Sequence, residues 1–316
     1  MTDPLIIDTH MHLYPTKAEG RKYVEMYDGW EFKAGGRLPE YGKYGGDPED
    51  GIAALDEAGA DRAIFVHFEP SLLFRHDRIA ALPEGLSEGE RSRQIGAINA
   101  ESAACLRKSN MWACGVGRDH PRLLPYVNID PSVMTPGENV AHLRDLVDRH
   151  GARGIKLHSV IQGFFMGDPR MRPVYEACLE MGLGIVAHSG SSHVMDQYGD
   201  PWAFAPVYER YPELRLIMAH MGNGSWHQTR LFAEAYPQAM YDVCELMEWI
   251  DIGKGPTAEQ FARLIRDIGS DRVMLGTDFP WWDPVDCVQK VMDLPLLSRE
   301  EKEAILGQNA VRLLGI

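Results

Sequence analysis

The feature that most constrains the fold is a unit repeated along the chain, in which a short apolar, β-rich run precedes a longer amphipathic segment. Eight such runs occupy residues 5–7, 62–67, 123–129, 154–158, 183–188, 214–220, 239–243 and 272–278. Strands that alternate with helices indicate parallel βαβ units, and eight units in roughly 250 residues match the size of a (β/α)8 barrel. We therefore predict an α/β protein with a TIM-barrel fold. An open doubly wound sheet is the alternative, but no Gly-x-Gly-x-x-Gly follows the first strand.

The segments between the strands carry helical patterns, several of which end at a glycine that can stop a helix. The predicted helices lie near 48–60, 137–150, 170–182, 201–211, 225–236, 257–268 and 298–313. Two long insertions, 13–47 and 69–98, follow the first and second strands. Because barrel active sites are built at the carboxyl ends of the strands, we expect these insertions to form lids or pocket walls. No linker or low-complexity tract divides the chain, and we predict one domain over residues 1–316.

Charge and cysteine content disfavour several function classes. The chain has 32 Lys and Arg against 46 Asp and Glu, a formal net charge of −14, which opposes binding to nucleic acid or to anionic lipid. Its 5 cysteines include no C-x-x-C pair, so we expect buried free thiols in a reducing compartment. The N-terminus lacks a basic segment followed by an apolar stretch, and no 18-residue apolar run occurs. We therefore expect a cytoplasmic protein, without a membrane segment, that acts on a small molecule.

Polar residues that can bind metal recur where the apolar strands end. They are His10, His12, His67, His158, His188, His220 and Asp278. In a His-x-His pair on a strand both imidazoles point to the same face, about 6.5–7 Å apart along the strand. All eight strand ends of a barrel converge on one mouth. Several imidazoles and a carboxylate gathered there would repel protons and one another, so a divalent cation is the simplest partner.

Four motifs resemble those of the amidohydrolase superfamily. They are Asp8-Thr9-His10-Met11-His12, Ala187-His188-Ser189-Gly190, Ala219-His220-Met221-Gly222 and Gly276-Thr277-Asp278-Phe279-Pro280. The chain is most similar to the amidohydrolase-related (amidohydrolase 2) branch, which contains metal-dependent hydrolases and the aminocarboxymuconate-semialdehyde decarboxylase group. The resemblance covers essentially the whole chain.

The resemblance implies roles for individual residues. His10, His12, His188 and Asp278 match the metal ligands. His220 matches a histidine that is catalytic in the decarboxylase group and that can bind a second metal in other branches. The implied cofactor is one Zn(II) ion, with Mn(II) as the alternative, because imidazole and carboxylate ligands accommodate both. Superfamily members with two metals often use a carboxylated lysine on the fourth strand as a bridge. Here Lys156 precedes His158 by one pleat, and a single-metal site with His158 facing the substrate is the favoured interpretation.

Two reactions fit these residues. The favoured one is hydrolysis of an amide, ester or lactone by a metal-activated water, with Asp278 accepting the water proton and His220 or His158 stabilising the oxyanion. We prefer it slightly because the segments around His158 and His188 resemble hydrolase members. The alternative is non-oxidative decarboxylation of a small unsaturated or aromatic acid. A TatD-like nuclease is a further alternative, but that branch places Glu where this chain has Gly276; a non-enzymatic metal-binding protein is another.

Further residues near the strand ends are candidates for substrate binding. They are His67, Arg170, Trp281 and Trp282, with His193, Tyr198 and Trp202 as residues that could close over the substrate. A tryptophan beside a metal would exclude water from the pocket, and an arginine would pair with a substrate carboxylate. Relatives often form pairs, and the aromatic residues between positions 23 and 45 suggest an interface. A homodimer is therefore a further expectation, by analogy.

Overall fold

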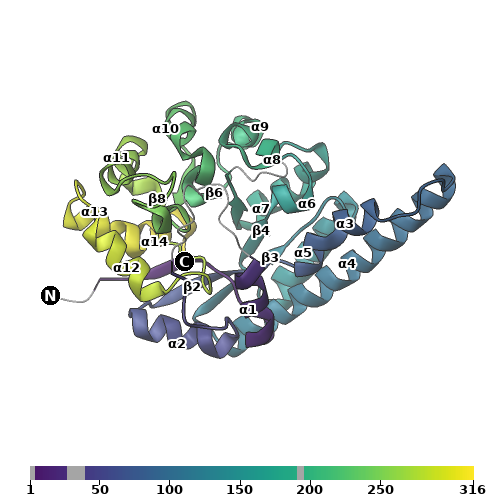
Figure 1. Ribbon diagram of the computed structural model, residues 1–316, viewed down its shortest axis with the longest axis horizontal. Coiled ribbons are helices and arrows are strands. Elements are labelled where there is room, and N and C mark those ends of the chain that lie inside the picture. Colours follow the sequence, from purple (N-terminus) through teal and green to yellow (C-terminus); the bar gives the residue numbers. More distant parts are fainter. Residues whose placement is uncertain (1–3, 27–39, 191–195) are drawn as a thin grey trace.

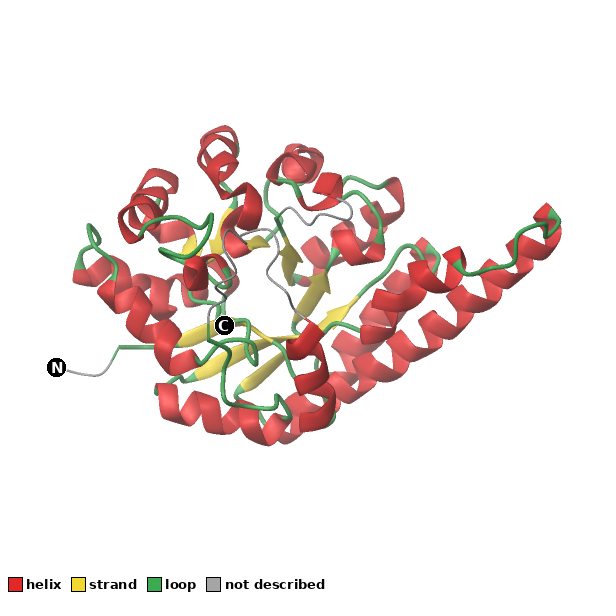
Figure 2. Ribbon diagram, viewed as in Figure 1, coloured by secondary structure: helices red, strands yellow, loops and turns green. Residues whose placement is uncertain are grey.

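The computed structural model describes residues 4–26, 40–190 and 196–316. Its eight strands form one parallel sheet in sequential order: β1 Ile7–Met11, β2 Arg62–Val66, β3 Leu123–Asn128, β4 Gly154–Leu157, β5 Gly184–His188, β6 Leu216–Ala219, β7 Met240–Asp242 and β8 Val273–Met274. The first strand meets the end of the last, since the Thr9 amide donates to the Leu275 carbonyl at 2.8 Å and Met11 bridges Phe279. The predicted TIM barrel is therefore confirmed. Figure 2 shows the strands in the centre of the molecule, with the helices around them.

The helices pack around the outside of this sheet (Figure 1). The longer ones are α1 Lys17–Met26, α2 Pro48–Ala58, α4 Glu88–Asp119, α5 Pro136–His150, α7 Arg172–Met181, α10 Trp226–Ala235, α11 Ala258–Ile268 and α12 Pro284–Asp293. Shorter ones are α3 Arg75–Ala80, α6 Ser159–Gln162, α8 Asp196–Gly199, α9 Ala205–Arg210, α13 Arg299–Glu303 and α14 Asn309–Leu314. Left-handed glycines Gly151 and Gly182 end α5 and α7 as predicted, because glycine adopts a positive φ without strain.

The two long segments after β1 and β2 differ in structure. After β1 the chain forms α1, while positions 27–39 lie outside the described residues. After β2, the stretch 69–98 folds into a short 3₁₀ turn, α3 and the first turns of α4. Helix α4 begins with a capping box between Ser87 and Glu90. Its amino-terminal end extends past the other helices (Figure 1).

The barrel interior is layered, and this layering positions the site. Tyr126 fills the lower interior, where a Cβ on Gly154 or Gly184 would lie about 2.5 Å from its side chain. Val186 and Met240 belong to the same interior apolar cluster. Side chains two positions later on a strand point to the same face. Lys156, His188 and Asp242 are therefore directed into the barrel one layer nearer its carboxyl-terminal mouth.

All five cysteines are free. Cys114, Cys178, Cys244 and Cys287 are buried as expected, whereas Cys105 is partly exposed. In the part of the chain that the structure describes, no helix combines the length and the apolar character that crossing a membrane requires.

Candidate metal centre

Three side chains at the mouth of the barrel lie at the spacing of ligands to one ion. His10 Nε2 is 3.3 Å from His12 Nε2, and Asp278 Oδ1 is 3.6 Å from the first and 3.2 Å from the second. Ligand atoms about 2.1 Å from a tetrahedrally coordinated ion lie about 3.4 Å from one another. These residues therefore fit a single divalent cation, and three of the four predicted ligands lie together.

Three residues of the site that follow β6, β7 and β8 have unusual backbone dihedral angles. His220, Glu245 and Asp278 have φ values of 65°, 55° and 55°, the left-handed region that residues other than glycine rarely adopt. Such strain persists only where surrounding structure holds it, and it concentrates at functional sites. His220 also departs from the alternation of its strand, because it follows the inward-facing Ala219 and yet its ring lies 5.0 Å from that of His10.

The buried carboxylate of Asp8, beside the proposed ligand His10, connects the first strand of the barrel to the segment that follows the last strand. Asp8 Oδ1 accepts from the backbone amides of His10 at 2.9 Å and Thr277 at 3.1 Å, and Oδ2 accepts from the Thr277 hydroxyl at 2.5 Å. Burial raises the pKa of Asp8 to about 7, although these hydrogen bonds oppose the shift. Asp8 thus fixes the backbone of a ligand on β1 against the segment that carries Asp278.

Both nitrogens of His10 have defined partners. Nδ1 donates to Asp242 Oδ2 at 2.9 Å, and Nε2 lies 2.9 Å from the Lys156 amine. The carboxylate fixes the tautomer in which Nε2 carries a lone pair, which is the form that binds a metal. Burial lowers the pKa of Lys156, which favours an uncharged amine beside a cation. Whether Lys156 is carboxylated is untested, and the single-metal interpretation stays a prediction.

The remaining histidines continue from this centre as a row of rings. His220 lies 4.8 Å from His188 between ring centroids, and His188 stacks on His158 at 4.0 Å. Over the described ranges, three groups have ligand atoms that all lie within 4.8 Å of one another, and none of them includes His188. They are His10, His12 and Asp278; His220, Glu245 and Asp278; and His10, His220, Asp242 and Cys244. His188 as the fourth ligand therefore remains a prediction.

The electrostatics of the site suit a cation. Burial is the largest cause that holds the pKa values of His10, His12 and His220 well below the ordinary value of imidazole, and it lowers that of His188 to about 3. Burial also raises the pKa of Asp278 to about 7. Metal ions bind neutral imidazole and ionised carboxylate. The imidazoles are thus neutral, which is the form that binds metal, while a bound cation would favour the ionised form of Asp278.

The candidate substrate residues are dispersed. Trp281 lies beside the centre, with its ring 5.5 Å from that of His12 in an edge-on arrangement. Trp282 is buried and packs on Tyr41. Arg170 forms an ion pair with Asp168 at 2.7 Å and donates to the Pro131 carbonyl. Their substrate roles stay predictions, and His193 lies outside the described residues.

His67 is enclosed at the end of β2. Its Nε2 pairs with the Ser109 hydroxyl, and its ring contacts those of Phe65 and Trp112 at 5.6 and 5.4 Å between centroids. Only 3% of its surface is exposed. This environment favours a packing role, and the predicted contact with substrate is untested.

The burial of His67 predicts a pH dependence of stability. Burial lowers its pKa to about 3, whereas histidine in an unfolded chain titrates near 6.5. Between these values the unfolded chain binds a proton that the folded chain does not, so stability falls as the pH falls through this window. Relative to His67→Gln, the free energy of unfolding of the metal-free wild type should fall by about 1.4 kcal/mol per pH unit there. Urea titrations at several pH values measure this, and parallel curves for the two proteins would contradict it.

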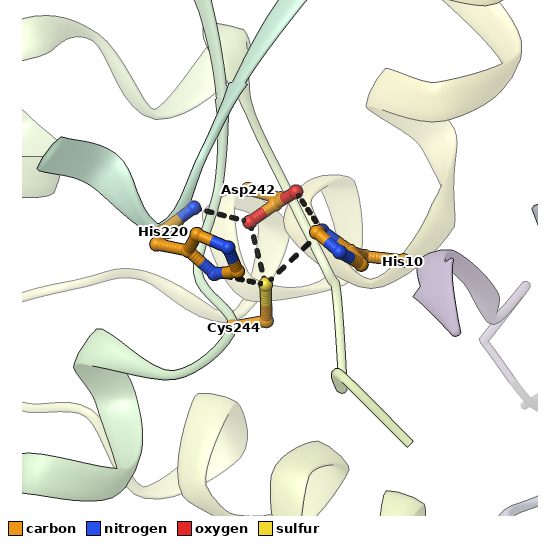
Figure 3. Close-up of side chains that lie close together, drawn as sticks. All are labelled: His10, His220, Asp242 and Cys244. Atoms are coloured by element: carbon orange, nitrogen blue, oxygen red, sulfur yellow. Dashed lines mark hydrogen bonds and ion pairs between the residues drawn. The ribbon is translucent and has the colours of Figure 1, made fainter. Parts of the chain in front are cut away.

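Sequence reasoning missed the contribution of β7. Asp242, Cys244 and Glu245 come from this strand and the turn after it, and all three are buried. Figure 3 shows Asp242 and Cys244 between His10 and His220. Asp242 is the last residue of β7, whereas Asp278 lies four residues after the end of β8. A search for polar residues at the ends of apolar runs would have found both. No sequence signal distinguishes Cys244 from an ordinary buried thiol.

The position of Asp242 predicts its effect on the metal. An asparagine side chain has one acceptor oxygen where aspartate has two. Asp242→Asn should therefore lose either the hydrogen bond that Oδ2 accepts from His10 or the hydrogen bonds that Oδ1 accepts. Removing an outer-shell partner of a ligating histidine typically costs about 10–100-fold in metal affinity. Competition with a chelator should show this loss, whereas Asp148→Asn, at an exposed position on α5, should bind metal like the wild type.

Fold and site together define a class: a TIM-barrel enzyme with a candidate divalent-metal centre at the carboxyl-terminal mouth of the barrel. The family follows from comparison with known sequences. The model of the amidohydrolase family matches residues 7–316, and the chain belongs to this family.

One curated relative and several proteins of similar fold are decarboxylases. The chain is 28% identical over 209 residues to the 2-amino-3-carboxymuconate-6-semialdehyde decarboxylase of Dictyostelium discoideum, a match that spans 56% of this chain and only 57% of that relative. Among solved structures, 2,6-dihydroxybenzoate decarboxylase from Rhizobium has a TM-score of 0.66 at 13% identity, covering 100% of this chain and 99% of the other. The 5-carboxyvanillate decarboxylase of Novosphingobium aromaticivorans, solved with manganese and 4-hydroxy-3-methoxy-5-nitrobenzoic acid, has a TM-score of 0.64 at 17% identity, covering 99% and 96%.

Proposed function

We propose that the protein is a metal-dependent, non-oxidative decarboxylase of a small unsaturated or aromatic carboxylic acid. The observation that carries this proposal is the match to a curated decarboxylase of the same family. The site supports it, because His10, His12 and Asp278 can hold a cation beside a further buried histidine, His220. The sequence alone slightly favoured hydrolysis, whereas the relatives favour the alternative reaction.

The reaction replaces a carboxylate by a proton. A proton is added to the carbon that carries the carboxylate, and the bond to the carboxylate carbon then breaks to release CO₂. A divalent ion held by His10, His12 and Asp278, with His188 as the proposed fourth ligand, would supply positive charge for an anionic substrate. Zn(II) is the proposed ion and Mn(II) the alternative, because this donor set accommodates both.

His220 is the proposed proton carrier. Its ring lies 5.0 Å from that of His10 between centroids, and one of its nitrogens lies within 4.8 Å of carboxylate oxygens of both Asp278 and Glu245. Burial and neighbouring imidazoles lower its pKa, but a bound anionic substrate would favour the protonated ring. His158 and Trp281 border the same region and are proposed to orient the substrate.

Hydrolysis is the second candidate, because Asp278 could accept a proton from water. Burial raises the pKa of Asp278 to about 7, which is the range of an effective general base at neutral pH. The substrate would then be an ester, lactone or amide.

A homodimer also remains a proposal, since it rests on analogy alone.

A paired substrate screen tests the reaction. Protein loaded with Zn(II) or Mn(II) would be incubated in D₂O with aromatic and unsaturated carboxylic acids, and in parallel with esters, lactones and amides. Decarboxylation predicts released CO₂ and deuterium at the vacated carbon of the product. Cleavage of an ester, lactone or amide without CO₂ release from any acid would instead establish hydrolysis.

A further inference from the structure

We propose that Cys244 is a positioning residue that holds His220 in the tautomer protonated on Nδ1, so that Nε2 is the nitrogen that gains and loses the reactive proton. The second part of this inference rests on the proposed function of His220. The first part concerns the protein alone and can be tested without a substrate.

The Cys244 sulfur is the centre of a buried polar cluster (Figure 3). It lies 2.9 Å from Asp242 Oδ1, 3.0 Å from His220 Nδ1 and 3.3 Å from His10 Nδ1. At most 3% of the surface of any of these four residues is exposed. Each polar atom must therefore find its partner within the protein, and the available protons can be counted.

The count begins with Asp242. An ionised carboxylate accepts hydrogen bonds and donates none. Its Oδ2 accepts from His10 Nδ1 at 2.9 Å, and its Oδ1 accepts from the His220 backbone amide at 2.8 Å. The thiol sulfur approaches the same Oδ1, and the only proton available for that contact is the thiol proton. If it pointed elsewhere, lone pairs of sulfur and oxygen would face each other at 2.9 Å.

The count then determines the proton on His220. A thiol has one proton, so once it is directed to Asp242 the sulfur offers only lone pairs to His220 Nδ1. A contact at 3.0 Å then requires Nδ1 to be the donor. Glu245 Oε2, 3.8 Å from the same nitrogen, is a second acceptor nearby. Because the partner of one ring nitrogen decides which nitrogen is protonated, Nε2 of the neutral ring is left with its lone pair.

This arrangement links the two functional histidines through one carboxylate. Asp242 orients His10 directly and orients His220 through the Cys244 sulfur and the backbone amide. Both rings are held with a proton on Nδ1, and both are left with Nε2 unprotonated for chemistry. Serine at position 244 would preserve one proton and the lone pairs, whereas alanine would remove both.

Tautomer measurement by ¹⁵N NMR tests the inference directly. Histidine-labelled, zinc-loaded protein would be compared as wild type, Cys244→Ser and Cys244→Ala, with His220 signals assigned from their loss in His220→Asn. We expect a protonated Nδ1 and an unprotonated Nε2 in the wild type and in Cys244→Ser, and loss of this preference in Cys244→Ala. Cys178→Ala, which removes a fully buried thiol from the apolar core, is the matched control and should leave the His220 signals unchanged.

Kinetics provide the second readout. Cys244→Ala should keep its metal and its KM but lose about 10–100-fold in kcat, as for other outer-shell partners, while Cys244→Ser should recover most of kcat. An unprotonated Nδ1 in the wild type, or a Cys244→Ala protein with unchanged His220 signals and kcat, would overturn the inference. If no acid is decarboxylated, the proposed function fails, but the NMR result still decides the tautomer.

Discussion

His10→Ala should abolish metal binding and nearly all turnover. His10 Nε2 is the ligand atom that lies near both of the others, 3.3 Å from His12 and 3.6 Å from Asp278, and it is fixed on both sides by Asp242 and Lys156. Removing it would leave His12 and Asp278, with His188 as the proposed further ligand, to hold the ion. A cation supplies several kcal/mol of charge stabilisation in such reactions, which corresponds to a loss on the order of 10⁴-fold in rate. Elemental analysis of the purified protein and kcat/KM for the best substrate measure the two effects.

Stability must be separated from metal loss in this variant. His10 is fully buried, so its replacement also leaves a cavity. His12→Ala, at a partly exposed ligand, should lose metal with less effect on folding, and His227→Ala, at an exposed helical position, should retain both metal and activity. Retention of a full metal equivalent by both His10→Ala and His12→Ala would disprove the ligand assignment.

The barrel and the location of its site follow from sequence because both depend on strand ends. Each apolar run predicts a strand, and parallel strands in a closed sheet bring their carboxyl ends together. His10, His12 and Asp278 could therefore be placed at one mouth of the barrel despite a separation of 266 residues between His12 and Asp278, while their selection as ligands followed from the family resemblance. The same rule applied to Asp242 would have been correct, since that residue also ends an apolar strand.

Other features depend on geometry that no periodicity encodes. His220 is brought to His10 by a positive φ, which reverses the orientation expected from strand alternation. The contact between Lys156 and His10 depends on how far a long side chain extends across the barrel. The identity of the reaction was open for another reason: hydrolysis and decarboxylation use the same ligands, and they differ in groups supplied by loops of irregular structure.

His220→Asn should retain the metal and lose turnover. His220 falls in groups with Asp278 and Glu245 and with His10, Asp242 and Cys244, but not in the group of His10, His12 and Asp278 that is the proposed ligand set. If that set holds the ion, the metal content should equal that of the wild type. Asparagine can hydrogen-bond but cannot carry a proton between pH 5 and 8. Loss of a general acid or base typically costs about 10²–10⁴-fold. The expected result is therefore a fall of kcat in this range with a full metal equivalent.

The combination of metal content and rate separates the roles that His220 can have. A ligand would lose metal and rate together, as expected for His10→Ala. A residue that only packs against the ligands would lose stability, with little change of kcat at temperatures where the protein is folded. A proton carrier alone would lose kcat while metal content and KM stay the same, and solvent deuterium would enter the product more slowly. An unchanged kcat in His220→Asn would exclude this role and leave His158 as the remaining imidazole in the row that is not a proposed ligand.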